Sequence, residues 1–171
     1  MGDHNMKPIL LIGMMGSGKT TIGKGLSEEL SLSWADTDQY IEQQTQNSIS
    51  HLFQHHGETY FRQLETQALQ SLIASAEIIS TGGGIIIMPD NRKILKNQAT
   101  VIYLKANINT LATRINPNDR PLLQNEDLND KLATLYHQRS KWYEECAHYM
   151  IETDLLTIDG VIATIKNLLT V

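Results

Sequence analysis

Short apolar runs of strand length alternate along this sequence with segments that have the periodicity of a helix. Each run is nearly continuous in apolar residues and is too short to form a helix. The runs lie at Ile9 to Ile12, Ile78 to Ser80, Val101 to Leu104 and Tyr149 to Ile151, with a weaker one at Leu32 to Ala35. Continuous apolar strands are typical of a parallel sheet that is covered on both faces. The pattern therefore predicts an α/β fold with a five-stranded parallel sheet and helices on both faces.

Between these runs, apolar residues recur every three or four positions, which indicates helices. These patterns extend from Ile22 to Leu30, Ile49 to Phe53, Phe61 to Leu72, Ile108 to Ile115, Leu128 to Tyr136 and Ile162 to Leu169. One polar interruption, Asn116 to Asp127, predicts an exposed loop between two helices. Because 171 residues is close to the size of one domain, we expect residues 1–171 to form a single domain.

Charge and cysteine content exclude several classes of protein. The 14 basic and 19 acidic residues give a net charge of −5, which argues against nucleic acid or an anionic membrane as a partner. The single cysteine, Cys146, excludes a disulfide framework within the chain and a cysteine-based zinc site. It also indicates a reducing compartment. Since the first apolar run is too short for an export signal or a membrane span, we expect a cytoplasmic protein. We also expect a monomer.

The segment from Gly13 to Thr20 matches GxxxxGK(S/T), the pattern of a phosphate-binding loop, or P-loop. It follows a predicted strand and precedes a predicted helix, which is the arrangement that phosphate binding requires. Its glycines let successive backbone N–H groups face phosphate oxygens, and the helix N-terminus adds its positive end. Lys19 would reach the β and γ phosphates, and the Thr20 hydroxyl would bind Mg²⁺. A glycine-rich turn with a solvated lysine is the alternative.

We therefore predict a three-layer P-loop NTPase fold that binds ATP. The predicted nucleotide-binding residues of the loop are Gly13, Gly16, Ser17, Gly18, Lys19, Thr20 and Thr21. A GTPase switch is disfavoured, because no aspartate is followed by glycine at the third position and no NKxD motif occurs.

Polar motifs elsewhere indicate a second, acceptor-binding side. Asp36 and Asp38 stand at the end of the second predicted strand, where α/β sheets bind their ligands. One carboxylate beside a metal and another beside an incoming hydroxyl would suit phosphoryl transfer to an alcohol. A strand-to-helix turn capped by aspartate is an equally good interpretation of these two residues alone.

Three further motifs favour the acceptor site. The sequence GETYFRQLE from Gly57 places Arg62 in a helix, and TGGG from Thr81 to Gly84 ends a buried strand with three glycines. Backbone can approach a ligand closely at such glycines. RPLL, from Arg120 to Leu123, lies in the polar loop.

With these motifs in this order, the sequence resembles the shikimate kinase family, small P-loop enzymes related to nucleoside monophosphate kinases. The similarity runs from about Ile9 to about Ile151, and a later arginine, Arg139, completes it. The resemblance implies ATP-dependent phosphorylation of the 3-hydroxyl of shikimate, on the route to chorismate and the aromatic amino acids. It also implies Mg²⁺, held by Thr20 and by Asp36 through water.

The resemblance further assigns individual roles. Asp38 would contact the accepting hydroxyl. Arg62 and Arg139 would hold the shikimate carboxylate with paired hydrogen bonds, and Gly82, Gly83 and Gly84 would line the same pocket. Arg120 would close over the phosphates as part of a mobile lid at about residues 116–126, which gives three catalytic residues: Lys19, Asp38 and Arg120. Arg114 would stack on adenine, unless it is an ordinary surface arginine. Residues 36–65 would form a helical acceptor-binding region.

One residue departs from the family pattern. This chain has Gln46 where many family members have glycine, which puts the local turn in doubt.

Two rival functions stay open. Another small-metabolite P-loop kinase, such as a gluconate kinase, would share the P-loop. A nucleotide-dependent binding module without phosphotransfer would leave the acceptor-side arginines without a purpose. His51 and His55 have helical spacing but no third ligand, so we interpret them as helix surface.

Overall fold

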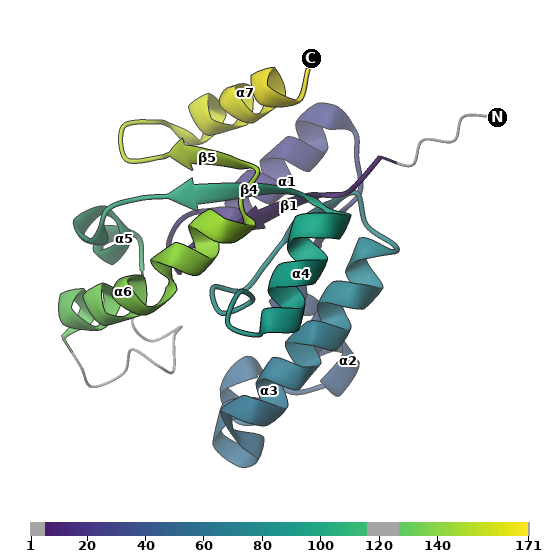
Figure 1. The fold of residues 1–171 in the computed structure, drawn as a ribbon, viewed down its shortest axis with the longest axis vertical. Coiled ribbons are helices and arrows are strands. Elements are labelled where there is room, and N and C mark those ends of the chain that lie inside the picture. Colours follow the sequence, from purple (N-terminus) through teal and green to yellow (C-terminus); the bar gives the residue numbers. More distant parts are fainter. Residues whose placement is uncertain (1–5, 116–126, 171) are drawn as a thin grey trace.

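A computed structural model describes residues 6–115 and 127–170 (Figure 1). Its five strands are β1 (Ile9–Ile12), β2 (Trp34–Asp36), β3 (Ile78–Ser80), β4 (Thr100–Lys105) and β5 (Tyr149–Glu152). All of them are parallel and stand in the order β2-β3-β1-β4-β5. The five predicted strands are thus confirmed, although the second begins and ends later than the sequence suggested.

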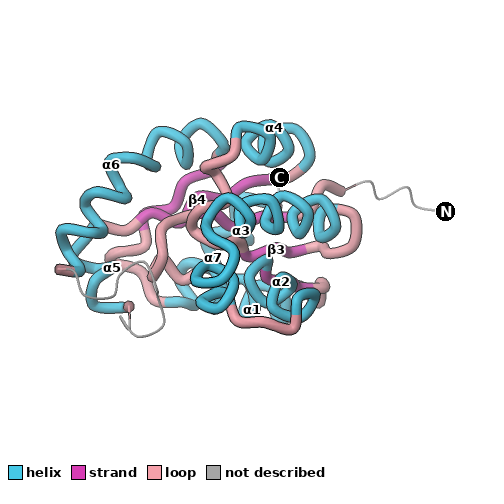
Figure 2. Tube along the Cα trace, turned by 90° about the horizontal axis from the view of Figure 1, so that it is seen from below, coloured by secondary structure: helices cyan, strands magenta, loops and turns pink. Residues whose placement is uncertain are grey.

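The described residues form seven helices, six of which cover the two faces of this sheet. They are α1 (Lys19–Leu30), α2 (Thr37–Thr45), α3 (Ile49–Ile73), α4 (Pro89–Gln98), α5 (Ile108–Arg114), α6 (Leu128–Cys146) and α7 (Ile158–Leu169). Helices α1 and α7 pack on one face, whereas α3, α4, α5 and α6 pack on the other (Figures 1 and 2). No helix in these two described stretches has the length and apolar character that crossing a bilayer requires.

The central strand β1 is apolar throughout because neighbouring side chains enter two different cores. In β1, Leu10 and Ile12 join the core beneath α3, α4 and α6, while Ile9 and Leu11 join the core beneath α1 and α7. Successive side chains of a strand point to opposite faces. Both faces are therefore dry, and the continuous apolar pattern of the sequence follows from that.

The strand order creates a crevice at the carboxyl ends of β1 and β3. From β1 the chain crosses β3 to reach β2, and from β3 it crosses β1 to reach β4. Connections that leave adjacent strands in opposite directions open such a crevice, and ligands of α/β proteins bind there. The P-loop follows β1 and the three glycines follow β3, so the fold brings both motifs to this crevice.

Helices α2 and α4 have no clear periodic signal in the sequence. Helix α2 buries only Thr37 and Ile41, and α4 buries only Asn91 and Leu95. Each is held by its start: Asp36 caps α2, and Pro89 occupies the first turn of α4. Too few apolar positions remain in either helix to form a detectable stripe.

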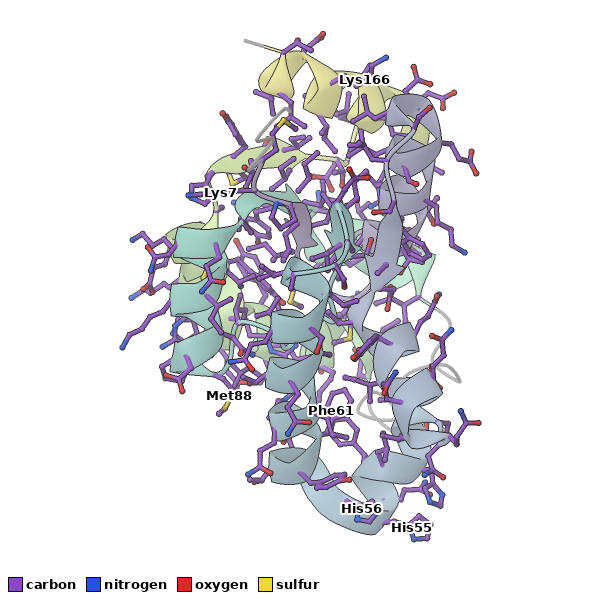
Figure 3. All side chains as sticks on the ribbon, turned by 90° about the vertical axis from the view of Figure 1, so that its right-hand side faces the viewer. Lys7, His55, His56, Phe61, Met88 and Lys166 are labelled. Atoms are coloured by element: carbon purple, nitrogen blue, oxygen red, sulfur yellow. The ribbon has the colours of Figure 1, made fainter. Side chains whose placement is uncertain are left out.

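The two helical patterns between Ile49 and Leu72 belong to one element with a sharp break. Gly57 has φ 83° and ψ 174°, which interrupts α3 between the two patterns. Only glycine adopts this conformation without strain. Figure 3 shows His55 and His56 beside this break, pointing outward, with Phe61 between the helices. Phe61 packs with Ile41 and Leu52, so α2 and both parts of α3 share a small core of their own.

Gln46 ends α2 in the left-handed conformation, with φ 56°. Glycine is favoured at this position because a side chain there crowds the backbone. The turn is therefore of the kind that a glycine would make, and glutamine makes it under strain. Its side-chain Nε2 donates to the carbonyl of Gln43 at 2.7 Å, which offsets part of this cost.

We predict that Gln46→Gly stabilises the protein by roughly 0.5 kcal/mol, since relief of left-handed strain exceeds the added entropy of the unfolded chain. Gln43→Gly is the matched control, because Gln43 is exposed but helical. It should destabilise by about 1 kcal/mol. Urea unfolding of the two variants measures both changes in stability. A loss of stability in Gln46→Gly would show that the left-handed conformation of Gln46 is not strained.

Candidate active site

The P-loop connects β1 to α1 and curls around the side chain of Lys19. Gly16 and Gly18 have φ values of 82° and 96°, so the curl depends on glycine at both positions. The Lys19 ammonium donates to the carbonyls of Gly13 and Met14 at 2.8 and 2.9 Å, and the residue is only 8% exposed. A buried cation and the N–H groups at the start of α1 thus face the same space. This arrangement suits a phosphate group.

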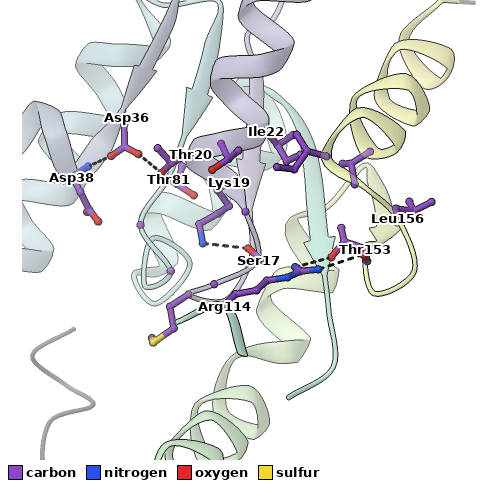
Figure 4. Close-up of a pocket in the computed structure, with 18 of the residues that line it drawn as sticks. Ser17, Lys19, Thr20, Ile22, Asp36, Asp38, Thr81, Arg114, Thr153 and Leu156 are labelled. Carbon is purple, nitrogen blue, oxygen red and sulfur yellow. Dashed lines mark hydrogen bonds between the residues drawn. The ribbon is translucent and has the colours of Figure 1, made fainter. Parts of the chain in front are cut away.

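A cavity of about 450 Å³ opens in front of this loop (Figure 4). Its walls include the predicted nucleotide-binding residues from Gly16 to Thr21, together with Asp36, Asp38, Thr81, Gly82, Gly83 and Arg114. Gly13 lies behind the loop, where a Cβ would come 2.5 Å from the carbonyl of Leu104. Of the predicted nucleotide-binding residues that the structure describes, all but Gly13 therefore line one cavity.

Thr20 and Asp36 meet at the inner end of this cavity. The Thr20 hydroxyl donates to Asp36 Oδ2 at 2.9 Å, while Asp36 Oδ1 accepts from the backbone N–H groups of Asp38 and Gln39. The same carboxylate therefore caps α2 and fixes the first residue after the P-loop lysine. Because it joins β2, α1 and α2, it holds Asp38 in the crevice.

The Thr20 and Asp36 oxygens fit a hard cation such as Mg²⁺, which prefers few protein ligands together with phosphate and water. Within residues 6–115 and 127–170, no three His, Cys, Asp or Glu side chains gather in a way that could hold a metal. An ion at this place would hence take the rest of its ligands from phosphates and water. His51 and His55 only stack, with ring centroids 4.0 Å apart.

A smaller cavity of about 80 Å³ adjoins the first one. It is lined by the predicted acceptor-side residues Asp38, Arg62, Gly82, Gly83, Gly84 and Arg139, together with Met15, Ile49, Phe53, Phe61 and Glu65. Asp38, Gly82, Gly83 and Met15 belong to the walls of both cavities. The two spaces therefore meet beside the Asp38 carboxylate.

Arg62 is held between two glutamates of its own helix. Its Nη1 donates to Glu65 Oε1 at 2.6 Å, and its Nε and Nη2 donate to Glu58 Oε1 at 3.3 and 3.1 Å. Arg62 and Glu65 are 6% and 1% exposed, whereas Glu58 is largely exposed. Burial raises the pKa of Glu65 to about 7, although Arg62 opposes the shift. Glu65 was given no role from the sequence, although its spacing of three residues from Arg62 indicated an ion pair on one helix face.

Arg139 reaches the same cavity from α6 and is 4% exposed. It hydrogen bonds to the Tyr143 hydroxyl, which donates to the carbonyl of Gly83 at 2.5 Å. Burial raises the pKa of Tyr143 to about 12, so this hydroxyl stays protonated and keeps its donor role. Tyr143 also stacks on Tyr103 of β4, with ring centroids 5.0 Å apart. Because Tyr143 lies one helical turn after Arg139, its contact with β4 also holds Arg139 in place.

The glycines after β3 leave space for the charged side chains around them. A Cβ on Gly82 would lie 2.8 Å from Asp38 Oδ1, and one on Gly84 would collide with the Arg62 guanidinium. A Cβ on Gly83 would make ordinary contacts of 3.5 Å or more. The Gly82 N–H donates to the Thr37 hydroxyl at 3.0 Å, which ties this loop to α2.

The outer end of the larger cavity is formed by Arg114 and by the chain after β5. Arg114 donates to the side-chain and backbone oxygens of Thr153 at 3.3 and 3.4 Å (Figure 4). Leu156 and Ile158 complete this wall, and neither was assigned from the sequence. The available signal was their apolar character in the short segment between β5 and α7, at the sheet edge that carries the P-loop. Arg120 and the predicted lid at 116–126 lie outside the described residues.

Comparisons with known proteins give a consistent result. The sequence model of a family described as shikimate kinase matches residues 15–170. A shikimate kinase from Staphylococcus aureus (strain MSSA476) is 42% identical over 168 residues, which cover 98% of this chain and 96% of that protein.

Two solved structures are also similar to the chain. A shikimate kinase from Acinetobacter baumannii in complex with shikimate has a TM-score of 0.91 and 37% identity, covering 95% of this chain and 92% of that one. A shikimate kinase from Bacteroides thetaiotaomicron has a TM-score of 0.88 and 30% identity, covering 97% and 99%.

The glycine contacts predict different costs for two neighbouring substitutions. Gly84→Ala should destabilise the protein by roughly 1 to 3 kcal/mol, because the added methyl group displaces a buried guanidinium. Gly83→Ala is the matched control and should change stability by less than about 1 kcal/mol, since its contacts are ordinary. Chemical unfolding of both variants tests this, and equal costs would show that the Arg62 contact is unimportant.

Proposed function

The chain belongs to the shikimate kinase family, and on this basis we propose that it transfers the γ-phosphoryl group of ATP to the 3-hydroxyl of shikimate. The products are shikimate 3-phosphate and ADP. The observation that carries the proposal is the pair of cavities that share Asp38, Gly82 and Gly83. Transfer between two bound molecules requires that their sites meet at the reacting atoms, and these sites meet beside a carboxylate.

On the donor side, the P-loop binds the triphosphate. Backbone N–H groups and Lys19 neutralise the β and γ phosphates, and Arg114 with Leu156 and Ile158 encloses the adenine end. Thr20 and Asp36 would hold Mg²⁺, which would supply positive charge beside the transferring group. The bond from Thr20 to Asp36 at 2.9 Å supports this assignment, because it keeps both oxygens at the edge of the cavity.

On the acceptor side, formed mainly by residues 36–65, Arg62 and Arg139 bind the shikimate carboxylate. A planar guanidinium meets a carboxylate with two parallel hydrogen bonds, so it fixes the direction of the ring as well as its presence. With the ring held in this way, the 3-hydroxyl lies at Asp38. That carboxylate orients the hydroxyl or accepts its proton while the phosphoryl group transfers.

Arg120 and the segment 116–126 complete the proposal as a lid over the phosphates. An arginine that approaches the transferring group can raise the rate by ~10³ to 10⁵ in related reactions. We also propose that the protein acts as a monomer, with the whole site formed within the single domain 1–171.

The proposal predicts acceptor-dependent turnover. Purified protein with γ-labelled ATP and Mg²⁺ should transfer label to shikimate. Gluconate in place of shikimate is the matched control, because it is also a carboxylated polyol, and it should accept little label. Transfer to gluconate alone would favour the rival metabolite kinase. Acceptor-independent ATP hydrolysis would favour a nucleotide-dependent binding module.

Asp38→Asn should lower kcat at least ~10²-fold, because the amide can neither accept the proton nor hold the hydroxyl as a carboxylate does. The KM for ATP should change little, since the P-loop is untouched. Asp90→Asn is the control, as Asp90 is exposed in the first turn of α4 and lines neither cavity. Steady-state kinetics of the three proteins decide the matter, and near-normal turnover by Asp38→Asn would remove Asp38 from the mechanism.

A further inference from the structure

The acceptor cavity contains four charged side chains whose charges balance. Asp38 and Glu65 carry negative charge when ionised, and Arg62 and Arg139 carry positive charge. Glu65, Arg62 and Arg139 are all buried. Because charges inside a protein are screened less than charges in water, any ion that enters this cavity must be compensated by the groups around it.

Glu65 uses only one of its two carboxylate oxygens in the described structure. Oε1 accepts from Arg62 Nη1 at 2.6 Å, whereas Oε2 is buried and has no hydrogen-bond partner among the described residues. A buried carboxylate oxygen without a donor is costly in the ionised state. Oε2 is therefore a place where a proton can bind without breaking an existing hydrogen bond.

The groups that face Glu65 come from three helices. Arg62 lies on its own helix, Asp38 on α2, and Arg139 and Tyr143 on α6. Burial and the Asp38 carboxylate favour protonation, while the two arginines favour ionisation; Tyr143 is neutral. Burial is the largest contribution and raises the pKa of Glu65 to about 7. Near neutral pH, the free protein thus contains Glu65 in both states.

An anionic acceptor would shift this balance. This step depends on the proposed function, in which the shikimate carboxylate pairs with Arg62 and Arg139. Those are the two cations that favour ionised Glu65, and the incoming carboxylate would share them. It would also place a third negative charge in a cavity that has two positive ones. Both effects raise the proton affinity of Glu65.

We propose that Glu65 takes up one proton from solvent when the acceptor carboxylate binds to Arg62 and Arg139, and releases it when the product leaves. The proton binds to Oε2, and no other covalent bond changes. The occupied cavity then contains Arg62 and Arg139 against Asp38 and the acceptor, so its charges balance again. Glu65 is a positioning residue here, since it acts on the acceptor through Arg62.

This linkage has a defined sign. Below about pH 6, Glu65 is already protonated, so the acceptor Kd should not depend on pH. Above about pH 7, binding must first add a proton, and the Kd should rise by up to about tenfold per pH unit. Proton uptake should follow the same course, from near zero at pH 6 to most of one proton at pH 8.

Isothermal titration of the whole protein with shikimate tests the proposal. Each titration is run at pH 6 and pH 8, in pairs of buffers with low and high heats of ionisation, so that the number of protons is measured directly. Wild-type protein should show most of one proton taken up at pH 8 and a Kd about tenfold weaker than at pH 6. Glu65→Gln, a neutral analogue of similar shape, should show no uptake and nearly the same Kd at both pH values.

Glu58→Gln is the matched control, because Glu58 contacts the same guanidinium from an exposed position. It should keep the wild-type proton uptake. Wild-type binding without uptake at pH 8, or uptake that persists in Glu65→Gln, would overturn the proposal. If Glu65→Gln does not fold, the wild-type titrations still test the proposal, because a wild-type Kd that is the same at pH 6 and pH 8 would overturn the proposal. Absence of any binding heat in wild-type protein would instead refute the proposed function, and this inference with it.

Discussion

A hydrogen-bonded junction between β1, β3 and α2 holds the site together. The carbonyl of Leu11, one residue before the end of β1, accepts from the Thr81 backbone at 3.3 Å and from its hydroxyl at 2.8 Å. The next residue, Gly82, donates to Thr37 at the start of α2. The strand that carries the P-loop, the glycines of the acceptor cavity and the helix that carries Asp38 therefore form one rigid unit. Backbone and side-chain hydrogen bonds within the protein therefore set the spacing of the two cavities.

The buried charges of the acceptor cavity are also held by hydrogen bonds within the protein. Burying the Arg62 guanidinium without a partner would cost several kcal/mol, and Glu65 and Glu58 prevent that cost with three hydrogen bonds. Two arginines held in this way can recognise a carboxylate with little reorganisation. The same burial raises the pKa of Glu65 to about 7, so under our proposal the group that positions Arg62 also makes acceptor binding sensitive to protons. Recognition and protonation are thus linked in one cavity.

Much of this arrangement could be predicted from the sequence. Continuous apolar runs indicated the parallel sheet, and the P-loop fixed the position of the first strand and helix, so the α/β fold with helices on both faces is confirmed. Helix α4 was missed, and α2 was expected only as part of the helical acceptor-binding region, because each contains a single pair of adjacent apolar residues, Tyr40 and Ile41 in α2 and Ile94 and Leu95 in α4. Glu65 and Tyr143 were given no site role. Tyr143 acts through the Gly83 carbonyl, which lies 60 residues away in the sequence and leaves no periodic signal, whereas the spacing of three residues between Arg62 and Glu65 was available. The roles of the site residues stay predictions.

The central claim is that one junction of β1, β3 and α2 places a nucleotide and a cyclic acid in adjoining cavities. A crystal structure with ADP and shikimate tests it most directly. The account predicts the diphosphate within the loop from Gly13 to Thr20, the shikimate carboxylate between Arg62 and Arg139, and the 3-hydroxyl at Asp38. A shikimate molecule bound elsewhere, or with its carboxylate turned toward the P-loop, would contradict the account.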